Sequence, residues 1–204
     1  MSENALIIFV KNLVIGQVKT RLAKTLGNDA AMKIYKQLLV IIHQNIQEVN
    51  ADKIVFYSTF IKNDIWENNL FEKKIQNGND LGERMKNAFK KSFSEGYKKI
   101  LIIGTDCPDV DENILEIAYE KLDQFEVVIG PALDGGYYLL GMKKECSFLF
   151  QNVEWSTDQV LNQTINLCKN NNLTYFLLPE LQDIDEEKDL IYFKNLSISK
   201  LKNS

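Results

Sequence analysis

Short runs of branched apolar residues alternate along the chain with longer segments in which apolar residues recur every three or four positions. The short runs are typical of buried strands, and the longer segments of amphipathic helices. Strands are predicted at 5–11, 53–58, 99–103, 126–129 and 173–177, and residues 135–140 are expected to be extended. Because these strands alternate with helices, the pattern predicts an α/β fold with a mostly parallel central sheet, flanked by helices and doubly wound in a Rossmann-like way.

The predicted helices carry capping signals at their ends. Gly27 suits the C-terminal end of one helix, and Asn28 can cap the next. Ser156 and Gln159 form the two ends of a capping box. Helices are predicted at 19–26, 28–49, 64–71, 80–93, 111–122, 157–169 and 185–196, and the tail 197–204 is expected to fray.

Composition and charge narrow the class of protein. The 204 residues are 45% apolar and 25% charged, which is ordinary for a globular chain and excludes a disordered one. A net charge of −4 gives no overall basic surface for nucleic acid or an anionic membrane. No apolar run approaches the roughly 18 residues of a membrane span, and a signal peptide is not expected. The three cysteines show no CxxC spacing, so we expect a cytoplasmic protein without a disulfide framework or zinc site.

The loops that follow the strands hold the candidate chemistry, because ligands of doubly wound sheets bind outside the carboxyl ends of the strands. The first loop contains Gly16 and the cations Lys11, Lys19 and Arg21, and it leads into a helix N-terminus. Backbone amides, the helix dipole and these cations would together hold phosphate. A solvated turn with surface lysines is the alternative. The use of arginine favours phosphate, because Arg21 and Arg84 are the two arginines of the chain and both lie in candidate loops.

The loop after the third predicted strand carries two carboxylates, Asp106 and Asp109, and is stiffened by Pro108. Carboxylates are hard oxygen ligands that suit Mg²⁺ or Mn²⁺. The alternative is that one aspartate makes an Asx turn and the other caps the following helix. Asp106 is the better metal candidate because it lies nearer the strand end, and Asp109 is the expected cap.

Two further loops offer polar groups. Asp134 supplies a carboxylate, Gly135 and Gly136 let the backbone approach a ligand closely, and Tyr137 supplies an aromatic face and a hydroxyl. A plain hairpin turn is the alternative for this segment. Asp185 precedes the last predicted helix, where it would either cap that helix or add another metal carboxylate.

The segment 76–84 is weaker as chemistry. In it Gln76 and Gly78 could meet a base edge and Arg84 a phosphate. Trp155 is first a packed aromatic residue and could also form part of a pocket wall. His43, the single histidine, is expected to be structural, which argues against a Ser-His-Asp hydrolase.

Together these loops resemble the nucleotide-diphospho-sugar transferase superfamily, which has the glycosyltransferase A fold, and more closely the radical-SAM/selenodomain-associated transferase 1 family. The segments that carry the resemblance are 16–22, 80–85, 104–109, 130–132, 134–138, 155–157 and 183–185. The resemblance implies one such domain over residues 1–204. It also implies a nucleotide bound by the first loop and by 76–84, a divalent ion on Asp106 with help from Asp185, and an Asp134 loop that faces the sugar or acceptor.

Three functions are consistent with these residues. The leading interpretation is metal-dependent glycosyl transfer from a nucleotide-sugar to a small-molecule acceptor, in which Lys19 and Arg21 hold the leaving diphosphate and Asp134 is the candidate base. The first alternative is nucleotidyl transfer from an NTP to a phosphorylated small molecule. The second is a non-catalytic nucleotide-binding protein. Asp183 and Asp185 are both candidates for reaching the metal, and the oligomeric state stays open.

Overall fold

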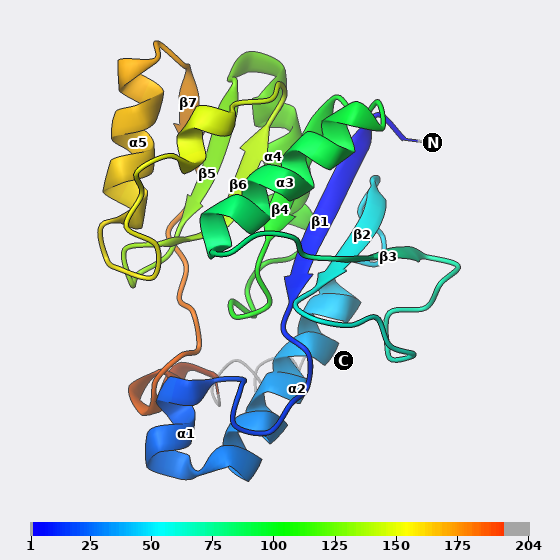
Figure 1. Ribbon diagram of the computed structural model, residues 1–204, viewed down its shortest axis with the longest axis vertical. Helices are drawn as coiled ribbons and strands as arrows, with labels where there is room; N and C mark the ends of the chain where they lie inside the picture. The colour runs from blue at the N-terminus through cyan, green and yellow to red at the C-terminus, as the bar shows by residue number, and fades with distance from the viewer. Residues whose placement is uncertain (1, 194–204) are drawn as a thin grey trace.

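The computed structural model describes residues 2–193, which form a seven-stranded sheet in the order β3-β2-β1-β4-β6-β5-β7 (Figure 1). The strands are β1 Asn4–Val10, β2 Asp52–Tyr57, β3 Phe71–Ile75, β4 Lys99–Ile103, β5 Val127–Pro131, β6 Tyr137–Met142 and β7 Tyr175–Leu177. Neighbouring strands are parallel except that β6 runs antiparallel to both β4 and β5. The predicted α/β fold with a mostly parallel sheet is therefore confirmed.

Helices cover both faces of the sheet. They are α1 Thr20–Leu26, α2 Asn28–Asn45, α3 Leu81–Ser94, α4 Glu112–Gln124 and α5 Val160–Asn170, with short 3-10 turns η1 Ser147–Phe150 and η2 Glu187–Asp189. Alternate residues of β1 enter two different cores: Leu6 packs in the cluster that contains Ile42 of α2, and Ile7 in the cluster that contains Phe89 of α3. This alternation is what a doubly covered sheet requires. No helix within residues 2–193 is long and apolar enough to cross a membrane.

Aspartate side chains begin two of the predicted helices. Asp80 caps α3 by accepting a hydrogen bond from the backbone N of Glu83 at 2.8 Å. Asp111 caps α4 in the same way from Ile114, at 3.0 Å. The expected cap at Asp109 is wrong, because that carboxylate instead accepts a hydrogen bond from the Tyr192 hydroxyl.

The helix predicted at 64–71 does not form, and the strand β3 that follows it was not predicted. The Asp64 carboxylate accepts hydrogen bonds from the backbone N of Trp66 and from the Tyr57 hydroxyl, and these bonds replace helical ones. Phe71 then begins β3, an edge strand whose centre is the polar segment 72–74. A polar edge strand lacks the apolar run by which buried strands are recognised.

Three other predicted boundaries differ from the structure. Gly27, with φ +83°, precedes the second helix, so Asn28 is its first residue and not its cap. The capping box that begins at Ser156 is absent and α5 starts at Val160, because Ser156 has φ +67° and is not helical. The last helix is a 3-10 turn followed by helical residues 190–193, and the predicted tail 197–204 lies outside the described residues.

The antiparallel strand β6 places a further loop at the edge where the parallel strands end. Strands β1 and β4 run side by side and finish at Val10 and Ile103. The β5–β6 connection turns back at the same edge, since β5 is parallel to the rest and β6 returns from it. The loops after β1, β4 and β5 therefore meet at one edge of the sheet.

Candidate functional site

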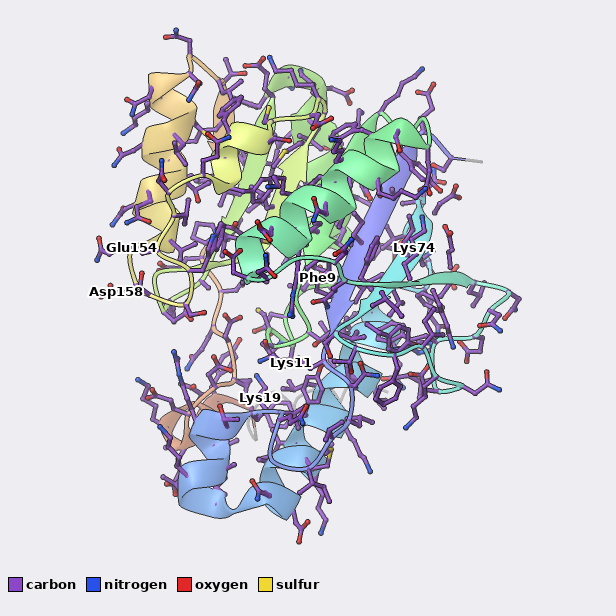
Figure 2. The ribbon with its side chains drawn as sticks, in the orientation of Figure 1. Phe9, Lys11, Lys19, Lys74, Glu154 and Asp158 are labelled. Carbon is purple, nitrogen blue, oxygen red and sulfur yellow. The ribbon has the colours of Figure 1, made fainter. Side chains whose placement is uncertain are left out.

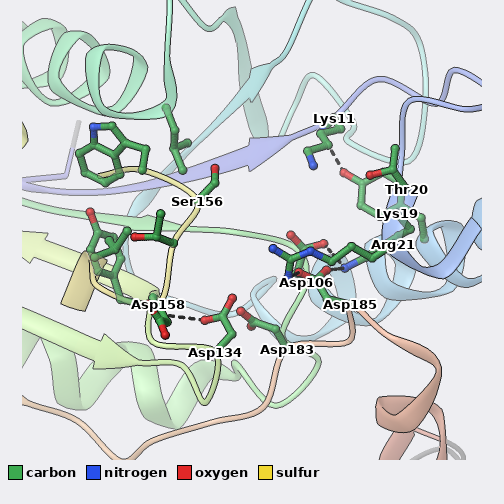
Figure 3. A pocket seen from close by; sticks show the side chains of 17 residues that line it. Lys11, Lys19, Thr20, Arg21, Asp106, Asp134, Ser156, Asp158, Asp183 and Asp185 are labelled. Atoms are coloured by element: carbon green, nitrogen blue, oxygen red, sulfur yellow. Dashed lines mark hydrogen bonds and ion pairs between the residues drawn. The ribbon is translucent and has the colours of Figure 1, made fainter. Parts of the chain in front are cut away.

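A cleft lies along this edge of the sheet. Its larger part is a cavity of about 540 Å³, and a second cavity of about 420 Å³ adjoins it. Both are lined by Lys11, Tyr35, Asp106, Tyr137 and Asp183, among others, so they form one continuous hollow. Its walls come from segments that are widely separated along the chain (Figures 2 and 3).

Lys19 stands at the centre of the charged side of the cleft. It adopts the left-handed conformation, with φ 47° and ψ 47°, immediately before α1. Its side chain is only 3% exposed, and its Nζ lies 2.5 Å from Asp106 Oδ1 and 2.8 Å from Asp185 Oδ1. The structure thus brings together a lysine after β1, an aspartate after β4 and an aspartate near the C-terminus.

The contacts around Lys19 shift the pKa values of Lys19 and Asp106. Burial opposes the charge on Lys19, but the carboxylates of Asp106 and Asp185 outweigh it and raise the pKa of Lys19. Burial likewise opposes ionisation of Asp106, but the Lys19 ammonium holds the pKa of Asp106 below its ordinary value. The site therefore contains one buried cation between two carboxylates.

Asp183 is in a different electrostatic position. Burial, followed by the charges of Asp106, Asp134 and Asp185, raises its pKa from the ordinary 3.8 to about 8. No ion pair to Asp183 or Asp134 forms within residues 2–193. The cleft consequently has more carboxylates than cations.

Two carboxylates remain accessible for a divalent ion. The side chains of Asp106 and Asp185 are 39% and 33% exposed, although both contact Lys19. No group of three His, Cys, Asp or Glu side chains in the described part of the chain is placed to hold a metal by itself. Mg²⁺ commonly takes one or two protein carboxylates and completes its shell with water and substrate phosphate. The donor set fits an ion of that kind.

Two more cations extend from the first loop. The Arg21 guanidinium lies 3.8 Å from Asp185 Oδ2 and is 51% exposed. Lys11 is exposed and lines both cavities, while its backbone N donates to the buried Tyr35 hydroxyl at 2.8 Å. Figure 3 shows Lys19 and Arg21 reaching toward Asp106 and Asp185.

The opposite wall carries Asp134, Gly136, Tyr137 and Trp155. Asp134 Oδ1 accepts a hydrogen bond from the backbone N of Gly136 at 2.9 Å, an Asx turn that fixes the carboxylate at the tip of the loop. Burial raises the pKa of Tyr137, whose hydroxyl lies against Met85 and stays protonated. This wall is an aromatic surface with an exposed carboxylate.

Three predicted glycines lie outside the lining of both cavities. Gly16 has φ +78° and makes a turn in the first loop. At Gly135, which has φ +85°, a Cβ would come within 2.3 Å of the Asp158 carbonyl oxygen, so glycine permits two loops to touch. Gly78 similarly packs against α3, where a Cβ would lie 2.7 Å from Arg84 N.

The second cavity holds the remaining predicted residues, Gln76 and Arg84. Gln76 Nε2 donates to the carbonyl oxygens of Phe56 at 2.9 Å and Val10 at 3.3 Å. Arg84 Nε donates to the Gly78 carbonyl oxygen at 3.1 Å. Both side chains therefore also support the loops that surround the cavity.

Several residues that line the cleft were not predicted from the sequence. Tyr35 lies within an amphipathic helix, where the pattern indicates only core packing, yet its ring lines both cavities. Ser156 and Asp158 were assigned to a helix start, whereas they form a loop facing the cleft. His43 is not among the residues that line the cleft, and it pairs with Glu67 at 3.0 Å.

The fold is a doubly wound sheet with one antiparallel strand, and at its carboxyl edge a cationic loop faces carboxylates. This architecture is of the nucleotide-diphospho-sugar transferase type. The chain belongs to the DUF2064 family, described as "Uncharacterized protein conserved in bacteria", whose profile matches residues 41–157.

Individual relatives agree with this class. A structure described as a nucleotide-diphospho-sugar transferase from Desulfovibrio desulfuricans G20 is 34% identical, has a TM-score of 0.83, and aligns over 91% of this chain and 84% of that one. The 2-phospho-L-lactate guanylyltransferase of Methanocaldococcus vulcanius is 26% identical over 91% of this chain and 82% of its own length. A cytidylyltransferase from Leptospira borgpetersenii shares the fold, with 15% identity and a TM-score of 0.58 over 93% of this chain and 84% of that one. The relatives are thus transferases of the nucleotidyltransferase or nucleotide-diphospho-sugar type.

Proposed function

We propose that this protein is a nucleotidyltransferase that acts as one domain and moves an NMP from an NTP onto a phosphorylated small molecule. The observation that carries the proposal is the buried Lys19 between Asp106 and Asp185, with Arg21 beside them at the edge of the cleft. From the sequence alone, glycosyl transfer is the leading interpretation and nucleotidyl transfer the first alternative. The relatives named as a guanylyltransferase and a cytidylyltransferase favour the nucleotidyl alternative instead.

The cations of the first loop would hold the triphosphate. Lys19 has three N–H donors, so it can keep one bond to Asp106 while another turns to a phosphate oxygen. Arg21 is exposed and offers the planar fork that matches phosphate. Positive charge fixed in this way stabilises the negative charge that develops on the leaving pyrophosphate.

Asp106 and Asp185 would hold Mg²⁺ or Mn²⁺, and when bound the ion would neutralise phosphate oxygens. Both carboxylates approach the same point, because both contact Lys19 Nζ. The ion alone would offset the surplus of carboxylates in the cleft, and without it those carboxylates would repel the triphosphate. We therefore expect metal and nucleotide to bind cooperatively.

The opposite wall would orient the acceptor. In the proposed step, an acceptor phosphate oxygen bonds to the α-phosphorus of the NTP, the bond from that phosphorus to the oxygen bridging to the β-phosphorus breaks, and pyrophosphate leaves. A phosphate nucleophile is already ionised near pH 7. Asp134 then has no proton to remove, so no base is required, and the ring of Tyr137 on this wall would position the acceptor.

The test supplies each of GTP, CTP, ATP and UTP with Mg²⁺ or Mn²⁺ and a panel of phosphorylated hydroxy acids that includes 2-phospho-L-lactate. We expect pyrophosphate release that requires metal, one preferred NTP and an acceptor, and that is lost in Asp106→Ala. Parallel reactions with nucleotide-sugars measure NDP release. NDP release without any pyrophosphate would overturn the proposal in favour of glycosyl transfer, and membership of the radical-SAM-associated transferase 1 family would then gain support.

A further inference from the structure

The loop that carries Asp185 is fastened to the rest of the site by its backbone. The backbone N of Ile184 donates to the carbonyl oxygen of Asp106 at 2.9 Å. The Ile184 side chain is fully buried in a small cluster with Leu38 of α2 and Phe193. The two flanking side chains, Asp183 and Asp185, both line the larger cavity. The loop therefore presents its carboxylates from a fixed base.

The buried carboxylate of Asp189 accepts hydrogen bonds from this loop on the side away from the cleft. Asp189 is 5% exposed, and its Oδ2 accepts hydrogen bonds from the backbone N of Asp185 at 3.0 Å and of Glu186 at 2.8 Å. Its Oδ1 accepts from Gln182 Nε2 at 3.0 Å. A capping box between Glu186 and Asp189 adds a reciprocal bond. One side chain thus joins both ends of the segment 182–186.

Burial of this carboxylate is costly for the fold. Among the described residues Asp189 has no ion-pair partner, and its charge is satisfied only by N–H donors of the loop. A buried charge held in this way costs desolvation energy that an apolar residue would avoid. The hydrogen bonds that Asp189 accepts hold the backbone at Asp185 in one conformation, and the Asp185 side chain contacts Lys19.

We infer that Asp189 is a positioning residue, which fixes the Asp185 backbone so that the Asp185 carboxylate stays against Lys19 beside Asp106. Asp189 does not line the cleft, so it acts on the site through the segment 182–186 that it holds. Its effect on ligand binding rests on the proposed function, whereas its effect on the loop does not.

The test compares two substitutions at this position. Asp189→Ala removes every acceptor from the loop. Asp189→Asn keeps one carbonyl oxygen that can face the N–H groups of Asp185 and Glu186, and its amide N–H can bond to Gln182 once that side-chain amide turns over. The asparagine variant should therefore rescue the loop if hydrogen-bond acceptance, and not charge, holds it.

Asp52→Ala is the matched control. Asp52 Oδ2 also accepts two hydrogen bonds, from Ser2 N and the Tyr97 hydroxyl, both at 3.1 Å. It begins β2, at the sheet edge opposite the cleft. Loss of Asp52 removes another hydrogen-bonded, partly buried carboxylate without touching the loop 182–186.

Two measurements are made on the full chain: hydrogen–deuterium exchange over residues 180–190, and affinity for the Mn²⁺ complex of whichever of GTP, CTP, ATP and UTP gives the largest thermal shift. In Asp189→Ala we expect exchange at least about tenfold faster and affinity about 10- to 100-fold lower, the range for a residue that orients a metal ligand. Asp189→Asn should recover most of both, and Asp52→Ala should change neither.

Unchanged exchange in Asp189→Ala would overturn the inference. So would faster exchange with unchanged nucleotide affinity, because the carboxylate would then be structural only. If the wild-type protein binds none of the four nucleotides, the proposed function fails, and the exchange comparison still decides whether Asp189 holds the loop.

Discussion

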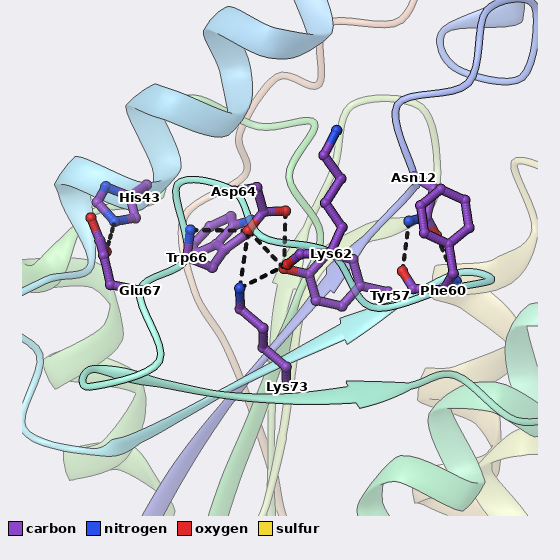
Figure 4. A network of polar contacts seen from close by, with 9 residues as sticks. All are labelled: Asn12, His43, Tyr57, Phe60, Lys62, Asp64, Trp66, Glu67 and Lys73. Carbon is purple, nitrogen blue, oxygen red and sulfur yellow. Dashed lines mark hydrogen bonds and ion pairs between the residues drawn. The ribbon is translucent and has the colours of Figure 1, made fainter.

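Two buried lysines in this molecule differ in the number of carboxylates around them. Lys73, 8% exposed, lies 3.3 Å from Asp64, and that one carboxylate also accepts from the Tyr57 hydroxyl and the Trp66 backbone (Figure 4). Lys19, 3% exposed, is instead shared by two carboxylates, each of which keeps accessible oxygens. Lysine and aspartate balance in the first pair. Around Lys19, Arg21 also contacts Asp185, but the cleft adds Asp134, Asp158 and Asp183, so its carboxylates outnumber its cations.

The difference separates a structural pair from the proposed binding site. A buried ion pair does little for stability beyond compensating its own desolvation, so a balanced pair needs only its internal hydrogen bonds. A surplus of carboxylates raises the energy of the folded chain until a cation binds. The Asp64 pair needs no ligand, and the Lys19 site is poised for one. Each prediction below tests this contrast.

The largest effect is expected from removing the aspartate of each pair. Asp106→Ala should lower turnover on the order of 10²- to 10³-fold, because the proposed ligand of the ion that would stabilise the transferring phosphate is lost. Little stability should be lost, since Lys19 retains Asp185. Asp64→Ala leaves Lys73 without its carboxylate and should cost about 3 kcal/mol of unfolding free energy with turnover nearly intact. Urea unfolding and pyrophosphate release measure both. Similar losses of turnover in the two variants would contradict the distinction between a structural Asp64 pair and a functional Asp106.

Replacing the lysine of each pair should also affect the two pairs differently. Lys19→Met is expected to weaken nucleotide binding about 10- to 100-fold, the value of charge-assisted hydrogen bonds. It should also strengthen binding of Mn²⁺ alone, because Asp106 and Asp185 lose the ammonium that lies between them. Calorimetric titration with Mn²⁺ and with nucleotide measures the two effects, and Lys73→Met should show neither. Weaker Mn²⁺ binding in Lys19→Met would contradict the surplus-charge interpretation.

The surplus should also appear as a dependence of stability on pH. The pKa of Asp183 is raised from 3.8 to about 8 by burial and by Asp106, Asp134 and Asp185, so the folded chain binds more protons than the unfolded chain between these values. Its contribution to unfolding free energy therefore falls as pH rises through this window. Asp183→Asn should flatten that slope in metal-free protein, as followed by urea unfolding at pH 5 to 8.5. An unchanged slope would show that Asp183 does not titrate in this range.

The smallest effect is expected at Arg21. Its side chain is half exposed and its nearest carboxylate oxygen is 3.8 Å away, so Arg21→Ala should change unfolding free energy by less than about 0.5 kcal/mol. Nucleotide affinity should still fall about 3- to 10-fold, since a charge-assisted bond to phosphate is lost. Thermal unfolding with and without Mn²⁺ and nucleotide measures both quantities. A large loss of stability would identify Arg21 as structural.

The sequence was sufficient where one physical signal dominated. The run 99–103 is continuous and apolar because β4 is covered on both faces, and its predicted bounds match the structure. The rule that parallel strands end at one edge was enough to expect Lys19 and Asp106 close together. By contrast, β3 escaped prediction because an exposed edge strand tolerates lysines, and Asp64 gave a false helix start through its side-chain hydrogen bonds.

The details of the site depended on tertiary contacts. The left-handed conformation of Lys19 leaves no trace in residue type, since such φ values favour glycine. The loop at Ser156 faces the cleft because Gly135 packs against Asp158, a contact between segments more than 20 residues apart. The local pattern also could not show that Asp185, and not Asp183, pairs with Lys19. The directions of the two side chains are set by the buried Ile184 between them and by the hydrogen bond from the Asp185 backbone to Asp189.

The Lys19–Asp185 pair joins residues 166 positions apart, which has a consequence for synthesis. A ribosome releases the first loop early, yet the second carboxylate emerges only after all seven strands of the sheet have been translated. The sheet can begin to assemble while the cleft still lacks one wall, and the order of folding follows the order of emergence. Nascent chains stalled before residue 182 should therefore be compact but unable to retain nucleotide.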